Sequence, residues 1–305
     1  MNEVVKIAAG YILICLLWGS TWLFIKMGLD SLSPMFSAGI RFLLASVFIY
    51  TLMKIRKVAI VKGKTAVILY FVIGIFSFGV PFYLVYWAEQ QIASGLASVL
   101  FAAFPFFVLI TSRLMLPGHK FDLYKLSGII IGFSGILVIF SKNININLDQ
   151  DFYAMIAVLG SAFIQGIVAV TVKKYGAELN PLSMNFFPTI IAGVFLTLSG
   201  FLIEDFSVLV FDTNAIISLL YLGLFGTVFT FTTYYWLLKR INVVLLSLSA
   251  FITPVVALVL GWIVLGEVFS SSDLAGASLV LAGILLANMT GLIKYVNTNF
   301  RLKKA

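Results

Sequence analysis

The stretch AIISLLYLGLFGTVFTFTTYYWLL, residues 215–238, contains 24 consecutive residues without a charged side chain. A helix that crosses the hydrocarbon core of a bilayer needs about 20 predominantly apolar residues. The stretch is long enough to cross, and it therefore predicts a transmembrane helix.

Nine further segments have a similar length and apolar character. Lipid cannot satisfy open backbone N–H and C=O groups, so a segment that spans the bilayer must be a helix or part of a closed barrel. The continuous apolarity of these segments lacks the alternation of barrel strands. The sequence therefore predicts an all-α integral membrane protein with ten transmembrane helices. Their expected ranges are Ile7–Met27, Pro34–Met53, Thr65–Trp87, Ser94–Leu114, Leu123–Ser141, Phe152–Val172, Leu182–Ile203, Ala215–Leu238, Val243–Leu265 and Leu274–Ile293.

The composition of the whole chain agrees with this interpretation. Hydrophobic residues make up 62% of the 305 positions, charged residues only 10%, and the mean hydropathy is +1.12. Soluble domains contain roughly 25% charged residues. Lipid must therefore surround most of the chain, and membrane lipids are its expected surroundings and partners.

The basic residues indicate how the chain is oriented. With both termini on the inner side, all but three of the 20 Lys and Arg residues fall at inner ends or in inner loops, the exceptions being Lys26, Arg41 and Lys142. Such an excess is typical of cytoplasmic loops, and it holds here only for an even number of helices. The sequence predicts a multi-pass protein of a bacterial-type cytoplasmic (inner) membrane with both termini in the cytoplasm. The same bias explains the net charge of +8 without a nucleic-acid partner.

The third to fifth expected helices resemble the eighth to tenth. Tyr86-Trp87 and Pro105 recur as Tyr235-Trp236 and Pro254, in each case 149 residues later. Each half of the chain contains five helices, so the second half must enter the membrane from the opposite side. The sequence therefore predicts an inverted repeat, a common architecture of transporters in which the substrate binds near the midplane between the repeats. The expected halves are residues 1–145 and 146–305.

Several short motifs occur in a fixed order along the chain: Trp18-Gly19-Ser20 followed by Lys26, Arg41-Phe42, Ala93–Pro105, Leu222–Thr227, and Pro254 followed by Leu265-Gly266-Glu267. Together they resemble the EamA-type signature of the drug/metabolite transporter superfamily. The family implies secondary transport, usually export, of amino acids, related metabolites or drugs. In one place the chain departs from the family pattern, because the first half reads Leu116-Pro117-Gly118-His119 where many members have Leu-Gly-Glu.

Charged side chains within a membrane are costly, and they are functional candidates for that reason. Arg41 and Lys26 lie in the outer parts of the expected first two helices. One hypothesis is that they attract a substrate carboxylate. The other is that they pair with Glu89 or Asp30 and order the helix ends. Lys26 and Glu89 are the candidate ion pair, and Glu89 is the candidate for proton coupling.

Polar and aromatic residues near the midplane complete the candidate site. A buried amide needs partners, so Gln165 binds either the substrate or another helix. Pairs of aromatic residues serve either as gates or as belts at the membrane interfaces. A proline in a helix removes a backbone hydrogen bond and predicts a kink, which is either a hinge or a static distortion. The candidate substrate-binding residues are Trp18, Ser20, Trp22, Arg41, Tyr83, Gln165 and Thr227, and the candidate gates or hinges are Tyr86, Trp87, Pro105, Tyr235, Trp236 and Pro254.

The chain contains no set of residues that would support catalysis. Neither a P-loop nor an HExxH motif is present, and no Asp or Glu lies at the centre of an expected helix. The sequence predicts a non-enzymatic carrier without a cofactor or a metal, with a neutral, zwitterionic or anionic substrate. The favoured function is alternating-access export of amino acids or similar small metabolites. A lipid or lipid-linked sugar flippase and a non-transporting component of a membrane complex remain alternatives, and the protein is expected to be a monomer or a homodimer.

Overall fold

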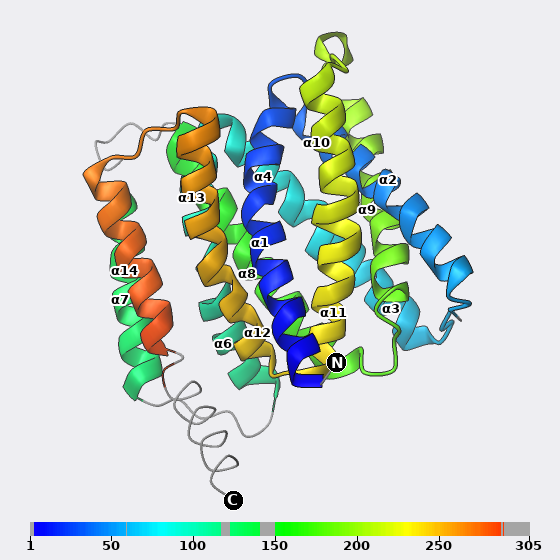
Figure 1. Ribbon diagram of the computed structural model, residues 1–305, viewed down its shortest axis with the longest axis horizontal. Helices are drawn as coiled ribbons and strands as arrows, with labels where there is room; N and C mark the ends of the chain where they lie inside the picture. Colours follow the sequence, from blue (N-terminus) through cyan, green and yellow to red (C-terminus); the bar gives the residue numbers. More distant parts are fainter. Residues whose placement is uncertain (1–2, 59, 117–122, 141–149, 288, 290–305) are drawn as a thin grey trace, which may run out of the picture.

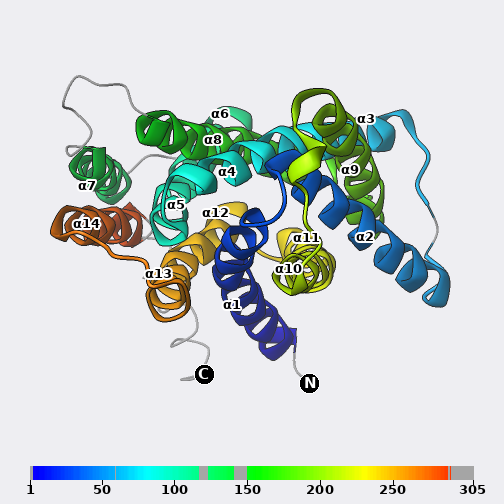
Figure 2. The same cartoon turned by 90° about the horizontal axis from the view of Figure 1, so that it is seen from above.

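The computed structural model describes residues 3–58, 60–116, 123–140, 150–287 and 289. Every regular element in these ranges is a helix, and eight helical segments are long and apolar enough to cross a membrane. The protein is therefore an all-α integral membrane protein, as the sequence predicts. The helices form a bundle in which the first and second halves of the chain are interleaved (Figures 1 and 2).

Four membrane-spanning segments are continuous helices and four are interrupted. The continuous ones are α1 (Glu3–Leu29), α2 (Pro34–Ile55), α8 (Gln150–Tyr175) and α9 (Ser183–Ile203). The interrupted ones are α3 (Lys64–Ile73), η1 (Gly74–Gly79) and α4 (Val80–Gln91); α5 (Ser94–Phe101) and α6 (Phe104–Met115); α10 (Thr213–Gly223), η4 (Leu224–Phe229) and α11 (Thr230–Arg240); and α12 (Val243–Ser247), η5 (Leu248–Phe251) and α13 (Ile252–Leu265). A short helix, η3 (Phe206–Val208), follows α9.

Two shorter helices occupy the places of the fifth and tenth expected spans. They are α7 (Leu123–Phe140), of 18 residues, and α14 (Ser271–Ala287), of 17 residues. The expected ends of these spans, Ser141 and Ile293, lie outside the described residues, as does the expected junction of the two halves. The count of ten helices and the division into residues 1–145 and 146–305 remain predictions.

The interruptions fall at matching places in the two halves. Both η1 and η4 are six-residue π-helices, and they begin at Gly74 and Leu224. Such π-segments are rare and often occur at functional sites. The helix also breaks just before Pro105, between α5 and α6, and again in η5, just before Pro254. The structure thus places a break just before Pro105 and just before Pro254, whereas Pro188 lies within the continuous helix α9; hinge motion at Pro105 and Pro254 remains a prediction.

Hydrogen bonds at the helix ends reveal the direction of each helix. The Lys26 ammonium, near the end of α1, binds the last carbonyl groups of α4, so these two helices end at the same face. Lys173, near the end of α8, binds the last carbonyl groups of α11 in the same way. Arg240 at the end of α11 donates to Glu3 at the start of α1, with 3.0 Å between Nε and Oε1. Hence α1 and α8 run in opposite directions. We call the face with Glu3 and Arg240 the N-terminal face, and the face where α1 and α4 end the distal face.

Helices α7 and α14 pack against each other at the edge of the bundle (Figure 2). Their contact depends on glycine, because a Cβ atom added to Gly283 would lie 2.3 Å from the backbone nitrogen of Gly132. A Cβ on Gly135 would lie 2.6 Å from the carbonyl oxygen of Gly276. Small residues permit such close backbone approach between membrane helices.

Candidate substrate cavity

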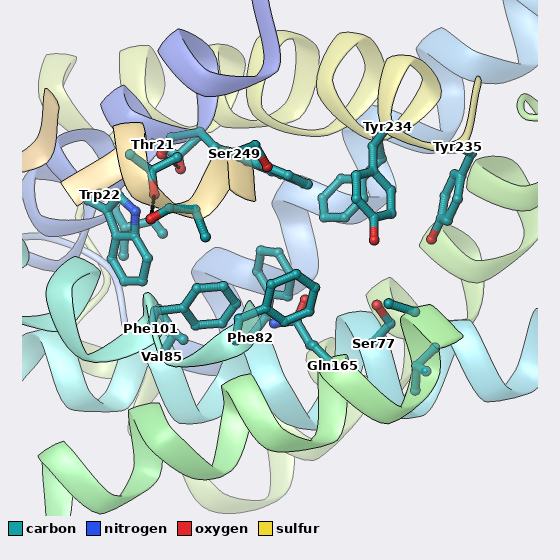
Figure 3. Close-up of a pocket in the computed structure, with 18 of the residues that line it drawn as sticks. Thr21, Trp22, Ser77, Phe82, Val85, Phe101, Gln165, Tyr234, Tyr235 and Ser249 are labelled. Carbon is teal, nitrogen blue, oxygen red and sulfur yellow. Dashed lines mark hydrogen bonds between the residues drawn. The ribbon is translucent and has the colours of Figure 1, made fainter. Parts of the chain in front are cut away.

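A cavity lies between the two halves of the chain. The centre of a water molecule can occupy about 90 Å³ of this cavity. A cavity that holds a single water has roughly 10–15 Å³ of such space. The cavity is therefore large enough for a small metabolite. In Figure 3, Trp22 and Phe101 lie toward one end, Tyr234 and Tyr235 toward the other, and Gln165 between them.

Most of the residues that line the cavity form pairs, with one member from each half. Residues of α1 pair with residues of α8 at a spacing of 147. Residues of α4 and of the α5–α6 segment pair with residues of the second half at a spacing of 149. The lining pairs are Trp18 and Gln165, Thr21 and Val168, Trp22 and Ala169, Ile25 and Val172, Phe82 and Phe231, Val85 and Tyr234, Phe101 and Ala250, and Phe104 and Thr253; the other lining residues are Arg41, Ser77, Tyr235 and Ser249. The same positions of the two halves thus build opposite walls of the cavity.

Among the described residues that line the cavity, Arg41 is the only charged one. Its side chain is 1% exposed, and neighbours on other helices hold it in place. Nε donates to the hydroxyl oxygen of Thr227 at 2.9 Å, and Nη1 donates to the Tyr86 hydroxyl at 3.1 Å. Nη2 donates to the carbonyl oxygen of Gly226, within η4, at 3.1 Å. Arg41 of the first half is therefore tied to the π-helical segment of the second half.

These bonds leave part of the Arg41 guanidinium available for a ligand. A guanidinium group has five N–H donors, and the three bonds use one on each nitrogen. No carboxylate among the described residues forms an ion pair with it. Its Cζ atom lies 4.9 Å from the ring centroid of Phe82 and 5.5 Å from that of Phe42, which is within cation–π range. The cavity thus carries one positive charge in a largely apolar wall, an arrangement that suits an anionic group on a bound molecule.

Four of the predicted substrate-binding residues line the cavity: Trp18, Trp22, Arg41 and Gln165. The Trp18 ring packs against those of Phe231 and Tyr234, with centroid distances of 5.5 and 5.2 Å. Among the described residues, the Gln165 side-chain amide makes one long hydrogen bond, 3.4 Å from Nε2 to the Ser161 hydroxyl oxygen one turn earlier. Most of the hydrogen-bonding capacity of Gln165 is therefore free to serve a ligand.

The other three predicted substrate-binding residues do not line the cavity. Thr227 is fully buried and positions Arg41 from behind. Ser20 lies on another face of α1 than Trp18 and Trp22, since a helix turns about 100° per residue, and its hydroxyl lies 2.6 Å from that of Tyr221. Tyr83, next to Phe82, is likewise turned away from the lining set.

The predicted aromatic gates divide into two kinds. Tyr86 is fully buried and bonded to Arg41, and Tyr235 lines the cavity. The tryptophans lie elsewhere, because Trp87 packs half-buried against the core and Trp236 lies under the Arg240 guanidinium, 4.2 Å from Cζ to the ring centroid. Only the tyrosines are placed to contact a ligand or its anchor, and their role as gates remains a prediction.

Lys26 contacts the main chain of Glu89 and not its carboxyl group. The Lys26 ammonium donates to the main-chain carbonyl oxygens of Glu89 and of Ile92, the latter at 3.2 Å. The Glu89 carboxyl is fully buried, and neither of its oxygens has a hydrogen-bond partner among the described residues. The expected carboxylate–ammonium contact is therefore not formed in this conformation, because the ammonium group is used to cap the end of α4.

The family glutamate, Glu267, stabilises the start of a helix in the other half. Its carboxylate accepts hydrogen bonds from the main-chain N–H groups of Ser94, at 2.7 Å, and of the next residue, at 3.1 Å. The residue just before α5, Ala93, occupies the N-cap position and has no side-chain acceptor. The matching position 149 residues later is Asn242, whose side-chain oxygen accepts from the main-chain N–H of Val244 at 2.8 Å and so caps α12 locally. The first half has no glutamate at the position that corresponds to Glu267. The start of α12 is instead capped by Asn242, from within the second half.

Most of the apolar lining, such as Phe82, Phe101 and Phe231, was missed by sequence reasoning, because lipid-facing phenylalanines have the same pattern. One signal was available. The 149-residue spacing that relates Tyr86 to Tyr235 also pairs the neighbouring positions Phe82 with Phe231, and following it along these helices would have identified part of the two walls.

A bundle of membrane-spanning helices around a shared cavity defines a polytopic transport protein. Two stretches of the chain, residues 6–141 and 152–289, match the EamA-like transporter family. The chain belongs to this family, within the drug/metabolite transporter superfamily, and is a membrane transporter.

Relatives of similar length support this assignment. The chain is 30% identical over 292 residues to "Uncharacterized transporter YoaV" of Bacillus subtilis, covering 94% of this chain and 98% of the relative. It is 29% identical over 282 residues to "Protein PagO" of Salmonella typhimurium, with 92% of each chain covered. It is 27% identical to "Uncharacterized inner membrane transporter YedA" of Escherichia coli, over 90% of this chain and 88% of the relative. A solved crystal structure superposes with a TM-score of 0.71 at 17% identity, over 95% of this chain and 98% of that one, which shows a shared fold.

Proposed function

We propose that this transporter is an alternating-access secondary carrier that exports amino acids or related small carboxylates. The observation that carries the proposal is the buried guanidinium of Arg41, which faces the cavity without a carboxylate partner among the described residues. A substrate carboxylate would satisfy its two remaining N–H donors. Charge-assisted hydrogen bonds of this kind are stronger than neutral ones.

The rest of the wall suits the remainder of such a substrate. Trp18, Phe101 and Tyr234 offer aromatic surface, and Gln165 offers an amide that can bind an ammonium or a hydroxyl group. Pockets for small molecules commonly combine apolar walls with a few polar groups that fix orientation. These features favour amino acids with sizeable apolar side chains.

Alternating access is supported by the relation between the halves, which we take to be an inverted repeat. Helices α1 and α8 run in opposite directions, and the wall positions are related by nearly constant spacings. In transporters of this construction, rocking of one repeat against the other exposes the same site first to one side and then to the other.

We place the carrier in the cytoplasmic membrane, with the N-terminal face toward the cytoplasm. The excess of Lys and Arg on the inner side supports this orientation. The Escherichia coli relative is named an inner membrane transporter, which supports the location. A non-transporting component of a complex would be expected to have a packed centre, so the cavity counts against that alternative.

The test is counterflow of labelled amino acids in liposomes that contain the purified protein. Hydrogen bonds to charged groups contribute about 1.5–3 kcal/mol, so Arg41→Gln should weaken substrate binding roughly 10- to 150-fold. Arg41→Lys keeps the positive charge but loses the planar arrangement of N–H donors, so its substrate affinity should lie between those of wild type and Arg41→Gln. Arg240→Gln is the matched control, because it removes a positive charge at the N-terminal face, outside the cavity.

Saturable counterflow that is lost in Arg41→Gln and kept in Arg240→Gln would support the carrier and its anchor. Folded wild-type protein that exchanges no amino acid would refute the proposed substrate class. A labelled short-chain lipid in the same vesicles would then test the flippase alternative. Export is tested separately, by comparing efflux from right-side-out and inverted vesicles.

A further inference from the structure

One buried acid is not accounted for by the proposed cavity. Glu89 lies in the last turn of α4, near the distal face, and is 0% exposed. Both carboxyl oxygens lack a hydrogen-bond partner among the described residues. The hydroxyl of Ser94, the first residue of α5, is also 0% exposed and has no hydrogen-bond partner within the described part of the chain. Two neighbouring segments thus leave polar atoms unsatisfied at the same end of the bundle.

The charged groups around Glu89 do not neutralise it. From α1, the Lys26 ammonium is bound to main-chain carbonyl groups. From α2, Arg41 is bound to Thr227, Tyr86 and Gly226. From the segment after α13, Glu267 adds a second negative charge and is occupied by the N–H groups of α5. Helix α5 has no charged residue, and the charged side chain of α8 nearest this face, Asp151, is exposed.

An ionised carboxylate is unfavourable in such a place. It is an acceptor-only group with about four lone-pair sites, and at Glu89 none of these sites receives a donor from the residues that the structure describes. Burying an unpartnered charge is far more costly than burying a neutral polar group. The neutral acid, with its O–H group, fits this closed environment much better than the carboxylate does.

We propose that Glu89 is a proton-binding site that controls the opening of the distal face. Closing the distal face takes up one proton from the solution on that side and forms the neutral Glu89 acid. Opening the distal face admits water and frees the Lys26 ammonium, and the acid then releases the proton to the same solution and becomes a carboxylate. A low pH at the distal face therefore favours its closed state. This inference takes the opening of the distal face from the proposed alternating-access function.

The first test measures the proton directly and needs no substrate. The infrared difference spectrum of wild type minus Glu89→Gln should show the C=O stretch of one neutral carboxylic acid, which the variant lacks. Glu89→Asp should restore an acid band at a shifted frequency. A wild-type spectrum without that band at neutral pH would overturn the proposal.

The second test reports opening of the distal face. In a Cys15→Ala background, Val85→Cys places a thiol in the cavity wall on α4, where a reagent that enters from the distal side reaches it. Labelling should accelerate between about pH 5 and pH 8, a range in which an exposed glutamate with a pKa of roughly 4.3 is already ionised. Adding Glu89→Gln should abolish this pH dependence.

The general rise in thiol reactivity with pH is removed by normalising to Val172→Cys, another lining position, which lies near the end of α8 at the N-terminal face. Persistence of the normalised pH dependence in Glu89→Gln would overturn the role of Glu89. A Val85→Cys thiol that is never labelled at any pH would instead argue against alternating access, and the infrared band would still decide whether Glu89 holds the proton.

Discussion

Replacing Glu267 with alanine tests whether the family glutamate joins the two halves at the distal face. The substitution removes a carboxylate that accepts two main-chain hydrogen bonds at the start of α5, at 2.7 and 3.1 Å. Because Ala93 supplies no acceptor, nothing within α5 replaces it. We expect α5 to fray at its first turn and to lose its attachment to the segment after α13.

The magnitude follows from the geometry. Each hydrogen bond to a charged group contributes about 1.5–3 kcal/mol, but Glu267 is only half-buried, so water replaces part of the loss. A net cost of roughly 2 kcal/mol is expected, compared with about 1 kcal/mol for a single side-chain cap. Asn242→Ala provides that comparison at the matching position, where the asparagine caps its own helix.

The assay is the melting temperature of purified protein in detergent, measured for wild type, Glu267→Ala, Glu267→Gln and Asn242→Ala. One kcal/mol corresponds to roughly 2–4 °C for chains of 150–250 residues. Glu267→Ala should therefore melt about 4–8 °C below wild type, with Glu267→Gln between the two. Equal shifts for Glu267→Ala and Asn242→Ala, or none for Glu267→Ala, would refute the idea that this carboxylate ties the halves together.

Three further predictions follow from contacts outside the cavity. Gly283→Leu should detach α14 from α7, because the Cβ atom alone would lie 2.3 Å from the backbone of Gly132, and crosslinking between engineered cysteines on the two helices should fall. Lys173→Met should lower the melting temperature by a few degrees, because the last carbonyl groups of α11 lose their donor, and Lys173→Arg should restore part of it. The pKa of Asp212 is lowered chiefly by the hydrogen bond from the Ala215 N–H group, so its stabilising effect is complete above the unfolded-state pKa and is lost as the pH falls through the folded-state pKa. The difference in melting temperature between wild type and Asp212→Ala should therefore shrink below about pH 4, and a constant difference would contradict this.

The membrane helices were predictable because lipid imposes a strong length and polarity requirement. The expected span Ile7–Met27 lies within α1, and Pro34–Met53 lies within α2. The breaks before Pro105 and Pro254 were predictable from the missing backbone donor. The π-helical segments η1 and η4 were not, because the wider hydrogen-bond pattern of the backbone leaves no distinct signature in apolar sequence.

The candidate site was predictable where a residue is costly in lipid. Arg41 and Gln165 stand out for that reason, and both line the cavity. Glu267 shows the limit of such reasoning. Its partners lie 172 and 173 residues earlier in the chain, so its role as a cap for α5 depends on packing between the halves and not on local pattern.

The paired walls of the cavity have a consequence for how a molecule sits within it. Arg41 breaks the pairing, because the position 147 residues later is the buried Pro188, which offers no side-chain donor. In the proposed carrier, an anionic head group bound to Arg41 would therefore lie off-centre, held by the first half of the protein only. Such a substrate would keep one orientation relative to the first half, and it would not need to rotate within the cavity when access changes from one face to the other. A compound with an acid at each end would leave its second charge against aromatic rings, so the cavity should discriminate between monoacids and diacids of equal length.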